Sequence, residues 1–317
     1  MRTSAQFLLT LILLTAASVA LHAAELSPPL GSNPNFTRLM MDADKTVGEV
    51  LAIRQDKYGF IWIGGKTGLA RYDGYRFKIF VNNSKDEHSL SANFIRDLFE
   101  DSHGRLWIAS ENGGMMLYNR DMENFDRIGY TNGSFPGRRG EVFYRIMEDT
   151  QHRIWFAGNR GVSVYDETQH KITQHLINSP LDNYLVYGLV QMSEEEFAIA
   201  TSGGMFQWNR RTDELLQLKH VEGNPHSLAN DEVRDILLDS YHNVWVATDK
   251  GISRFRPATK DFDNIIIPNA NPRIAGTPVW SLYEDNKRML WLATDGNGVM
   301  YFDPATRKMG SYSSGAS

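Results

Sequence analysis

Arginine and aromatic side chains recur at one position of this 317-residue chain, five residues before an aspartate that opens a turn. Guanidinium groups and aromatic rings anchor partners and bind sugars by stacking and hydrogen bonding. These positions hold Leu51, Arg96, Tyr144, Arg234 and Trp280, and the matching position of one degenerate copy, five residues before Met192, holds Tyr187. All members except Leu51 are therefore candidate ligand-binding residues.

The next position along the chain carries charges, with Asp97 and Asp235 each following an arginine. We favour ion pairs between repeats, together with core aromatics, because buried charges usually occur in satisfied pairs. The alternative is a ring of ligand-binding side chains at the mouth of a channel. The two aspartates could also be argued into the acid and base roles of a glycosidase or lyase.

A second candidate lies in the segment "YTNGSFPGRRGEV" (residues 130–142), which holds Arg138 and Arg139 among glycines and a proline. Two adjacent arginines could form bidentate contacts with the carboxylates or sulfates of an acidic ligand. The alternative is an ordinary solvated loop.

Motifs for catalysis, cofactors or metals are missing from the sequence. It has no phosphate-binding glycine loop, zinc-binding His-Glu pattern or nucleophile elbow. The segment "DGNG" (residues 295–298) lacks the further carboxylates of a calcium loop, which predicts a turn. Histidines such as His152 and His242 lie in turns without a metal-like i, i+4 pair, so we expect them to be solvated. We expect no catalytic residue, cofactor or metal.

The elements that position these residues form a repeat. The segment "DSHGRLWIAS" from Asp101 recurs from Asp56, Asp149, Asp239 and Asp285. If Ala198 takes the tryptophan position of the degenerate fourth copy, the spacings are 45, 48, 43, 47 and 46 residues. Periods of this length are typical of propeller blades or helical arrays.

Each copy divides into short β-rich segments, as in "VLAIRQ", "FIWIGG", "LARYD" and "FKIF" of the first. A second glycine recurs in every copy and predicts a backbone bend that a Cβ would obstruct. Helical periodicity is absent, and we interpret the recurring tryptophan as a packing residue. The sequence predicts an all-β protein, a β-propeller of four-stranded blades, near residues 47–81, 93–129, 142–176, 185–219, 231–267 and 278–312.

Counting strands predicts that the propeller is incomplete. Each copy supplies its own fourth strand, including the weak "MGSY" (residues 309–312), yet "FTRL" (residues 36–39) also resembles an edge strand. Propellers commonly close by pairing such a strand with the final blade. We expect six blades of a seven-bladed propeller; the alternative is a closed six-bladed ring in which residues 36–39 replace "MGSY".

Composition and the N-terminus indicate export. Residues 1–24 carry Arg2, an apolar run and small residues, which predicts a signal peptide cleaved near Ala24, with residues 25–35 as a linker. The run is too short and too polar to favour a membrane span. Lys and Arg total 33 against 38 acidic residues without like-charge runs, so we expect no nucleic-acid partner. The absence of cysteine excludes disulfides and thiolate metal sites.

The segments "IRQDKYGFIWIGGKTGLARYDG" (residues 53–74), "EHSLSANFIRDLFED" (residues 87–101) and "PHSLANDEVRDILLD" (residues 225–239) resemble the two-component regulator propeller repeat. The resemblance covers residues 36–312, although the fourth copy lacks both the turn aspartate and the tryptophan. It implies a periplasmic sensor region, followed in the full-length receptor by further blades, an immunoglobulin-like domain and an inner-membrane anchor. The output module would be a histidine kinase or a diguanylate cyclase, and whether the receptor dimerises stays open.

Three functions follow from these observations. The first is a non-catalytic sensor in the periplasm that binds a small molecule or saccharide and biases the conformation of an output module. The second is an exported propeller enzyme acting on polysaccharide, as a lyase or glycosidase. The third is a protein-interaction scaffold.

Overall fold

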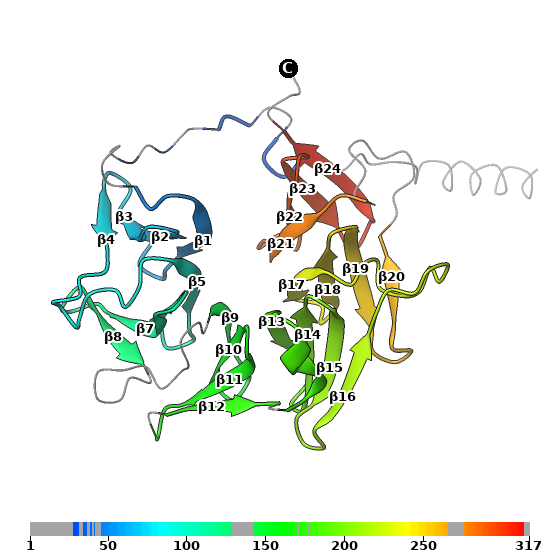
Figure 1. Cartoon of the computed structure of the whole chain (residues 1–317). Helices are drawn as coiled ribbons and strands as arrows, with labels where there is room; N and C mark the ends of the chain where they lie inside the picture. Colours follow the sequence, from blue (N-terminus) through cyan, green and yellow to red (C-terminus); the bar gives the residue numbers. More distant parts are fainter. Residues whose placement is uncertain are drawn as a thin grey trace, which may run out of the picture.

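The computed structural model describes residues 28–31, 34–36, 39, 41, 46–128, 142–169, 171–176, 178–265 and 276–313. These residues form six antiparallel sheets, each built from four consecutive strands. Figure 1 shows the sheets as blades around a common centre, with the first strand of each blade innermost. The expected all-β propeller of four-stranded blades is confirmed.

Blades 1 and 2 consist of β1 (Val50–Gln55), β2 (Ile61–Gly65), β3 (Leu69–Tyr72), β4 (Phe77–Phe80), β5 (Ile95–Glu100), β6 (Leu106–Ser110), β7 (Gly114–Asn119) and β8 (Asn124–Ile128). Blades 3 and 4 consist of β9 (Phe143–Glu148), β10 (Ile154–Gly158), β11 (Gly161–Asp166), β12 (Lys171–His175), β13 (Val186–Gln191), β14 (Glu196–Thr201), β15 (Gly204–Asn209) and β16 (Glu214–Leu218). Blades 5 and 6 consist of β17 (Val233–Leu238), β18 (Val244–Thr248), β19 (Gly251–Arg256), β20 (Asp261–Asn264), β21 (Val279–Glu284), β22 (Leu290–Thr294), β23 (Val299–Asp303) and β24 (Lys308–Tyr312).

The described part of the chain contains one short 3-10 helix, η1 (Pro180–Asn183), between blades 3 and 4. Ser179 caps it by accepting a hydrogen bond from the backbone N–H of Leu181. Within the same residues, no helix is long and apolar enough to cross a membrane.

The recurring aspartate and tryptophan bind each other in five blades. One carboxylate oxygen accepts a hydrogen bond from the indole Nε1 at 2.7–2.9 Å, and the other accepts backbone N–H groups of the turn. The pairs are Asp56–Trp62, Asp101–Trp107, Asp149–Trp155, Asp239–Trp245 and Asp285–Trp291. This satisfies a carboxylate and an indole that burial would otherwise leave unpaired, which confirms the tryptophan as a packing residue.

Blade 4 lacks this pair and fills the space differently. The fully buried ring of Trp208, from β15, lies 5.3 Å from Phe197 and 5.8 Å from Trp155 of blade 3. A tryptophan on the third strand thus replaces the one missing from the second, and Ala198 occupies the aligned position.

Positive backbone angles explain the second glycine of each copy. Its φ lies between 69° and 159° in every blade, at Gly68, Gly114, Gly161, Gly204, Gly251 and Gly298. At Gly204, a Cβ would lie 2.5 Å from the carbonyl oxygen of Leu218. The expected bend is confirmed. The first turn instead tolerates side chains, because His152, His242 and Arg288 adopt φ of 62–65° where blades 1 and 2 have glycine.

The series of blades has two uncovered faces. Successive inner strands pack from β1 through to β21, whereas β21 and β1 share no comparable packing among the described residues. Ile53 of β1 is 67% exposed, although its counterpart Leu98 in blade 2 is 4% exposed. On blade 6, Val299 is 43% exposed while its counterpart Met115 is fully buried. Figure 1 shows that these two blades end the series, with a gap between them.

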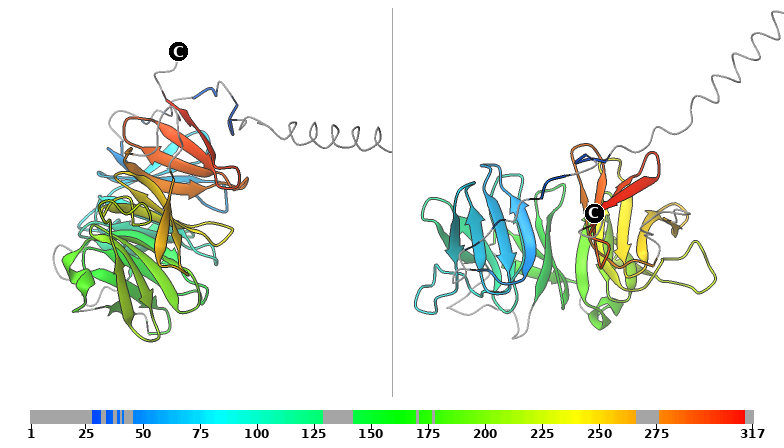
Figure 2. Two further views of the ribbon diagram at one scale, coloured as in Figure 1. Left: turned by 90° about the vertical axis from the view of Figure 1, so that its right-hand side faces the viewer. Right: turned by 90° about the horizontal axis from the view of Figure 1, so that it is seen from above.

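Residues near the N-terminus lie against blade 6, as the view from above in Figure 2 also shows. The hydroxyl of Tyr312, at the end of β24, accepts a hydrogen bond from the backbone N–H of Leu30 at 3.0 Å, and its ring contacts Phe36. Phe36 and Leu39 belong to no strand, whereas residues 37 and 38 of the expected edge strand lie outside the described residues. The fourth strand of blade 6 is β24, which contains the predicted "MGSY" segment. The predicted signal peptide at residues 1–24 lies outside the described residues.

Candidate ligand-binding site

All the residues of the candidate position lie at β-bulges. In every blade the pairing between the first and second strands skips the second residue of the inner strand. The skipped residues are Leu51, Arg96, Tyr144, Tyr187, Arg234 and Trp280. A bulge leaves a residue unpaired and re-aims its side chain, which is why bulges are frequent beside functional sites.

These side chains contact one another from blade 2 to blade 4. The guanidinium carbon of Arg96 lies 5.4 Å from the centre of the Tyr144 ring. That ring meets the ring of Tyr187 edge to face, with 5.4 Å between centroids. The hydroxyl of Tyr187 then donates a hydrogen bond to Glu232 at 3.0 Å.

The contacts continue into blades 5 and 6. Glu232 lies 3.2 Å from a nitrogen of Arg234, whose guanidinium carbon lies 4.5 Å from the centroid of the Trp280 ring. That ring is half-exposed. The five predicted residues of this position therefore form one continuous surface, here named the central strip: Arg96, Tyr144, Tyr187, Arg234 and Trp280.

The two arginines of the strip are paired within their own blades. Arg96 donates to Glu111 at 3.0 Å and Arg234 donates to Asp249 at 2.9 Å. For these two residues the expected ion pair between blades is wrong. Each carboxylate follows its arginine by fifteen residues, whereas Asn159 stands fifteen residues after a tyrosine. The sequence analysis did not identify Glu111 and Asp249. The constant spacing of fifteen residues between each arginine and an acidic residue could have revealed both.

Tyrosine hydroxyls of the strip stay protonated. Burial, followed by the hydrogen bond to Glu232 and its charge, raises the pKa of Tyr187 to about 12. Burial also raises the pKa of Tyr144 above its ordinary value. Both hydroxyls are thus neutral groups at physiological pH and can act as hydrogen-bond donors.

The residues that directly follow the strip residues along the inner strands form a second layer, which joins the blades and includes Asp97, Arg145 and Asp235. Arg145 of blade 3 donates to Asp235 of blade 5, with Nη2 and Oδ1 2.5 Å apart. It passes Gly188 of blade 4, where an added Cβ would lie 3.8 Å from the Arg145 Cγ. The charge of Asp235 is the main cause of a raised pKa at Arg145. The expected ion pairing between blades is confirmed for this layer.

The two aspartates of this layer also bind backbone groups of the following blade. Asp97 accepts the N–H of Ile146 at 2.7 Å, and Asp235 accepts the N–H of Leu282 at 2.9 Å. Burial raises the pKa of Asp97, although the charge of Arg145 and hydrogen bonds from the backbone N–H groups of Ile146 and Leu98 oppose that rise. Their hydrogen bonds give both carboxylates a structural role at the seams between blades.

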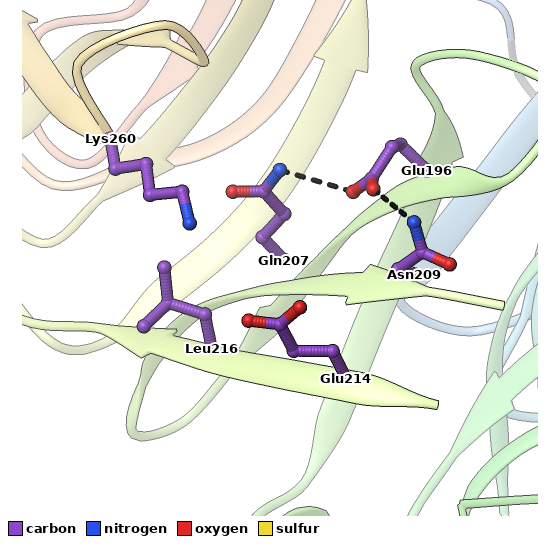
Figure 3. A pocket seen from close by; sticks show the side chains of 6 residues that line it. All are labelled: Glu196, Gln207, Asn209, Glu214, Leu216 and Lys260. Carbon is purple, nitrogen blue, oxygen red and sulfur yellow. Dashed lines mark hydrogen bonds between the residues drawn. The ribbon is translucent and has the colours of Figure 1, made fainter. Parts of the chain in front are cut away.

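The remaining candidates are two arginines and a pocket on blade 4. Arg138 and Arg139 lie outside the described residues. Figure 3 shows a pocket on blade 4, where Glu196 accepts hydrogen bonds from Gln207 and Asn209. Its volume of about 50 Å³ is little more than the ~30 Å³ share of one water molecule, so no saccharide fits it.

A larger hollow of about 550 Å³ lies beside blade 5, lined by the connector that follows β16. His220, Pro225 and Asn224 of that connector face Lys250 and Ile265 across it. Its size is in the range of small-molecule sites, ~300–1,000 Å³. The sequence analysis did not anticipate it, because the connector carries no cluster of residues typical of a binding site.

Comparison with known proteins extends this description. The family model described as "Two component regulator propeller" matches residues 89–112 and 227–250. A segment of 42 residues is 48% identical to "Histidine kinase P4" of Formosa agariphila, which is 13% of this chain and 3% of that protein.

Solved structures with the same fold include the extracellular domain of a hybrid two component system from B. thetaiotaomicron, at 21% identity and a TM-score of 0.71. The match covers 88% of this chain and 37% of that one, so the chain spans well under two thirds of the sensor proteins it matches. Virginiamycin B lyase from Staphylococcus aureus also has this fold, at 12% identity and a TM-score of 0.63, covering 86% of both chains.

The fold and the central strip define a β-propeller of four-stranded blades with an aromatic and ionic surface at the entry of its inner strands. Both matched segments begin at the serine of a Ser-Leu connector whose leucine, Leu90 or Leu228, is fully buried. Residues 89–112 and 227–250 therefore carry the two-component regulator propeller repeat, as the resemblance of the sequence predicts.

Proposed function

We propose that this chain is the extracytoplasmic, ligand-sensing propeller region of a bacterial signal-transduction receptor and is itself non-catalytic. The central strip carries this proposal, because five bulged side chains from five blades form one continuous surface there. A strip that served packing alone would be buried, yet Trp280 is 50% exposed.

The chemistry of the strip suits a saccharide. Its aromatic faces can pack against the apolar faces of sugar rings. Arg96 and Arg234 can donate hydrogen bonds to sugar hydroxyl groups, and Glu111 and Glu232 can accept hydrogen bonds from them. The connector that precedes Tyr144 carries Arg138 and Arg139, which we propose as additional contacts to an acidic group of the ligand.

The uncovered faces support the presence of further blades in the receptor. Ile53 and Val299 occupy positions that a neighbouring blade covers elsewhere in the molecule. A further blade between blades 1 and 6 would bury both, and a downstream module anchored in the membrane would receive the signal. The periplasmic location rests on the signal-peptide layout of residues 1–24 and on the extracellular domain among the structural neighbours.

Binding of a saccharide panel, measured by calorimetry, tests the sensing function. Trp280→Ala should weaken binding about tenfold, because ~1.4 kcal/mol of stacking energy corresponds to that factor. The control is Tyr75→Ala, which removes a 96% exposed ring distant in sequence from the strip and should leave affinity unchanged. Equal affinity in both variants would contradict the proposed site.

Turnover of the same panel separates a sensor from an enzyme. Release of reducing ends or of unsaturated products by the purified protein would contradict the non-catalytic assignment and favour a lyase or glycosidase. Absence of any saccharide or small-molecule binding, together with binding of another protein, would favour a scaffold.

A further inference from the structure

Two histidines and a glutamate meet at the seam between blades 2 and 3. His103 lies in the turn between β5 and β6, and His152 lies in the corresponding turn between β9 and β10. Glu148 is the last residue of β9, whereas Tyr144 of the central strip is the second. The cluster therefore lies at the opposite end of the inner strand from the proposed saccharide site.

The ligand atoms of these side chains converge. The imidazole Nδ1 of His152 lies 2.8 Å from a carboxylate oxygen of Glu148, and all three candidate ligand atoms lie within 4.8 Å of one another. The rings of His103 and His152 are 5.5 Å apart. Ligand atoms around a tetrahedral zinc ion are about 3.3 Å apart, given Zn–N and Zn–O distances of ~2.0–2.2 Å. Closing the site around an ion therefore requires the exposed His103 side chain to move toward the other two ligands.

Glu148 is held in place independently of the histidines. Its two carboxylate oxygens accept hydrogen bonds from the backbone N–H and the hydroxyl of Ser102, at 2.7 and 2.6 Å. Only 11% of its side chain is exposed. A fixed carboxylate beside two exposed imidazoles is a prepared ligand set, since hydrogen bonds that orient a ligating carboxylate strengthen metal binding.

An equivalent contact between a serine and a glutamate joins blades 5 and 6, where no histidine takes part. Between blades 5 and 6, Ser240 donates its N–H and hydroxyl to Glu284 at 2.7 and 2.8 Å. There, Tyr241 and Arg288 occupy the two histidine positions, and the guanidinium carbon lies 4.4 Å from the ring centroid. The Ser-Glu contact therefore serves the seam, and it does not require histidine.

We propose that His103, Glu148 and His152 form a binding site for a first-row divalent transition metal ion, with Zn²⁺ as the representative. Two imidazoles and one carboxylate are ligands that Zn²⁺ accepts, leaving a fourth position for water or an external ligand. Because the ligands come from two blades, the bound ion joins blade 2 to blade 3 at the end opposite the central strip.

Calorimetric titration of the metal-free purified protein with Zn²⁺ tests this site. One ion should bind per chain at this seam, and the double variant His103→Tyr/His152→Arg should weaken that binding at least about tenfold. This variant reproduces the residues of the blade 5–6 seam, so it retains the Ser102–Glu148 contact. His242→Ala removes a histidine from the corresponding turn of blade 5 and should bind like the wild type.

Visible absorption of the Co²⁺-substituted protein gives a second measurement, because bands of a low-symmetry site should appear in the wild type and be lost in His103→Ala. That single change in an exposed turn side chain covers the case in which the double variant fails to fold. The site is refuted if Zn²⁺ does not bind saturably, or if His103→Ala and the wild type bind it equally well. Saccharide binding at the central strip is measured separately and does not depend on this outcome.

Discussion

Arg145 and Asp235 are ninety residues apart in the sequence and belong to blades 3 and 5, yet Nη2 of one lies 2.5 Å from Oδ1 of the other. The pair bypasses the intervening blade 4, where Gly188 leaves room for the arginine side chain. It therefore couples blades that are not neighbours. The inner strands of the other blades pack against those of their neighbours along the chain, so this ion pair adds a contact between two blades that are not adjacent.

Removal of Arg145 should destabilise the protein strongly. Arg145→Met leaves the buried carboxylate of Asp235 without its cation, at an expected cost of about 3 kcal/mol in the free energy of unfolding. Arg76→Met, which removes a guanidinium that is 88% exposed, is the control and should cost less than ~0.5 kcal/mol. Urea unfolding measures both, and equal losses would show that the central pair contributes nothing specific.

The turn aspartates make stability depend on acid pH. Burial alone would raise the pKa of Asp101, but hydrogen bonds from Trp107 and from Arg105 outweigh it and hold the pKa below the ordinary value. The same direction holds at the turn aspartates of three other blades: Asp56, Asp149 and Asp285. A lowered folded-state pKa adds stability that is complete above the ordinary value of 3.8 and is lost as pH falls through the lowered pKa.

Asp101→Asn tests this linkage. The variant should lose about 2 kcal/mol of stability at neutral pH, as is typical of charged hydrogen bonds, and its loss below pH ~4 should be shallower than that of the wild type. Asp121→Asn, in an exposed turn of blade 2, is the matched control. Thermal melts across an acid series measure the effect, and parallel curves for Asp101→Asn and the wild type would contradict it.

A methyl group at Gly204 should be costly. Gly204→Ala combines a φ of +107° with a Cβ 2.5 Å from the Leu218 carbonyl oxygen, so it should destabilise blade 4 by more than ~1 kcal/mol. Gly223→Ala shares the positive φ, at +78°, but its Cβ would meet nothing within 4 Å. The difference between the two variants in urea unfolding isolates the collision from the backbone strain, and similar losses would exclude the collision.

The uncovered faces should bind a hydrophobic dye. Ile53→Glu and Val299→Glu place charges on these faces, so they should reduce dye fluorescence and aggregation without lowering stability. The counterpart change Leu98→Glu, at a covered face, should instead unfold the protein, because it buries an unpaired charge. A wild-type protein that is monodisperse, binds no dye and melts in one sharp transition would argue against a missing neighbouring blade.

The sequence alone determined the blades, because the interactions that shape each blade are local. The turn aspartate and its tryptophan are six residues apart, and the bend glycine acts through its own φ. The aligned position of the central strip was likewise predictable, since the repeat returns Arg96 and Arg234 to equivalent places. The second-strand tryptophan missing from blade 4 was visible too, but its replacement by Trp208 was not, since that substitution arises from another strand.

Only the tertiary structure decided which side chains meet across blades. The Arg145–Asp235 pair, the contact of Tyr187 with Glu232, and the convergence of His103 on Glu148 each join residues at least 45 positions apart. Such contacts depend on how blades are spaced around the centre and on which small residue leaves a path, as Gly188 does. A repeat fixes the position of a residue within its blade, but the neighbouring blades determine its partner.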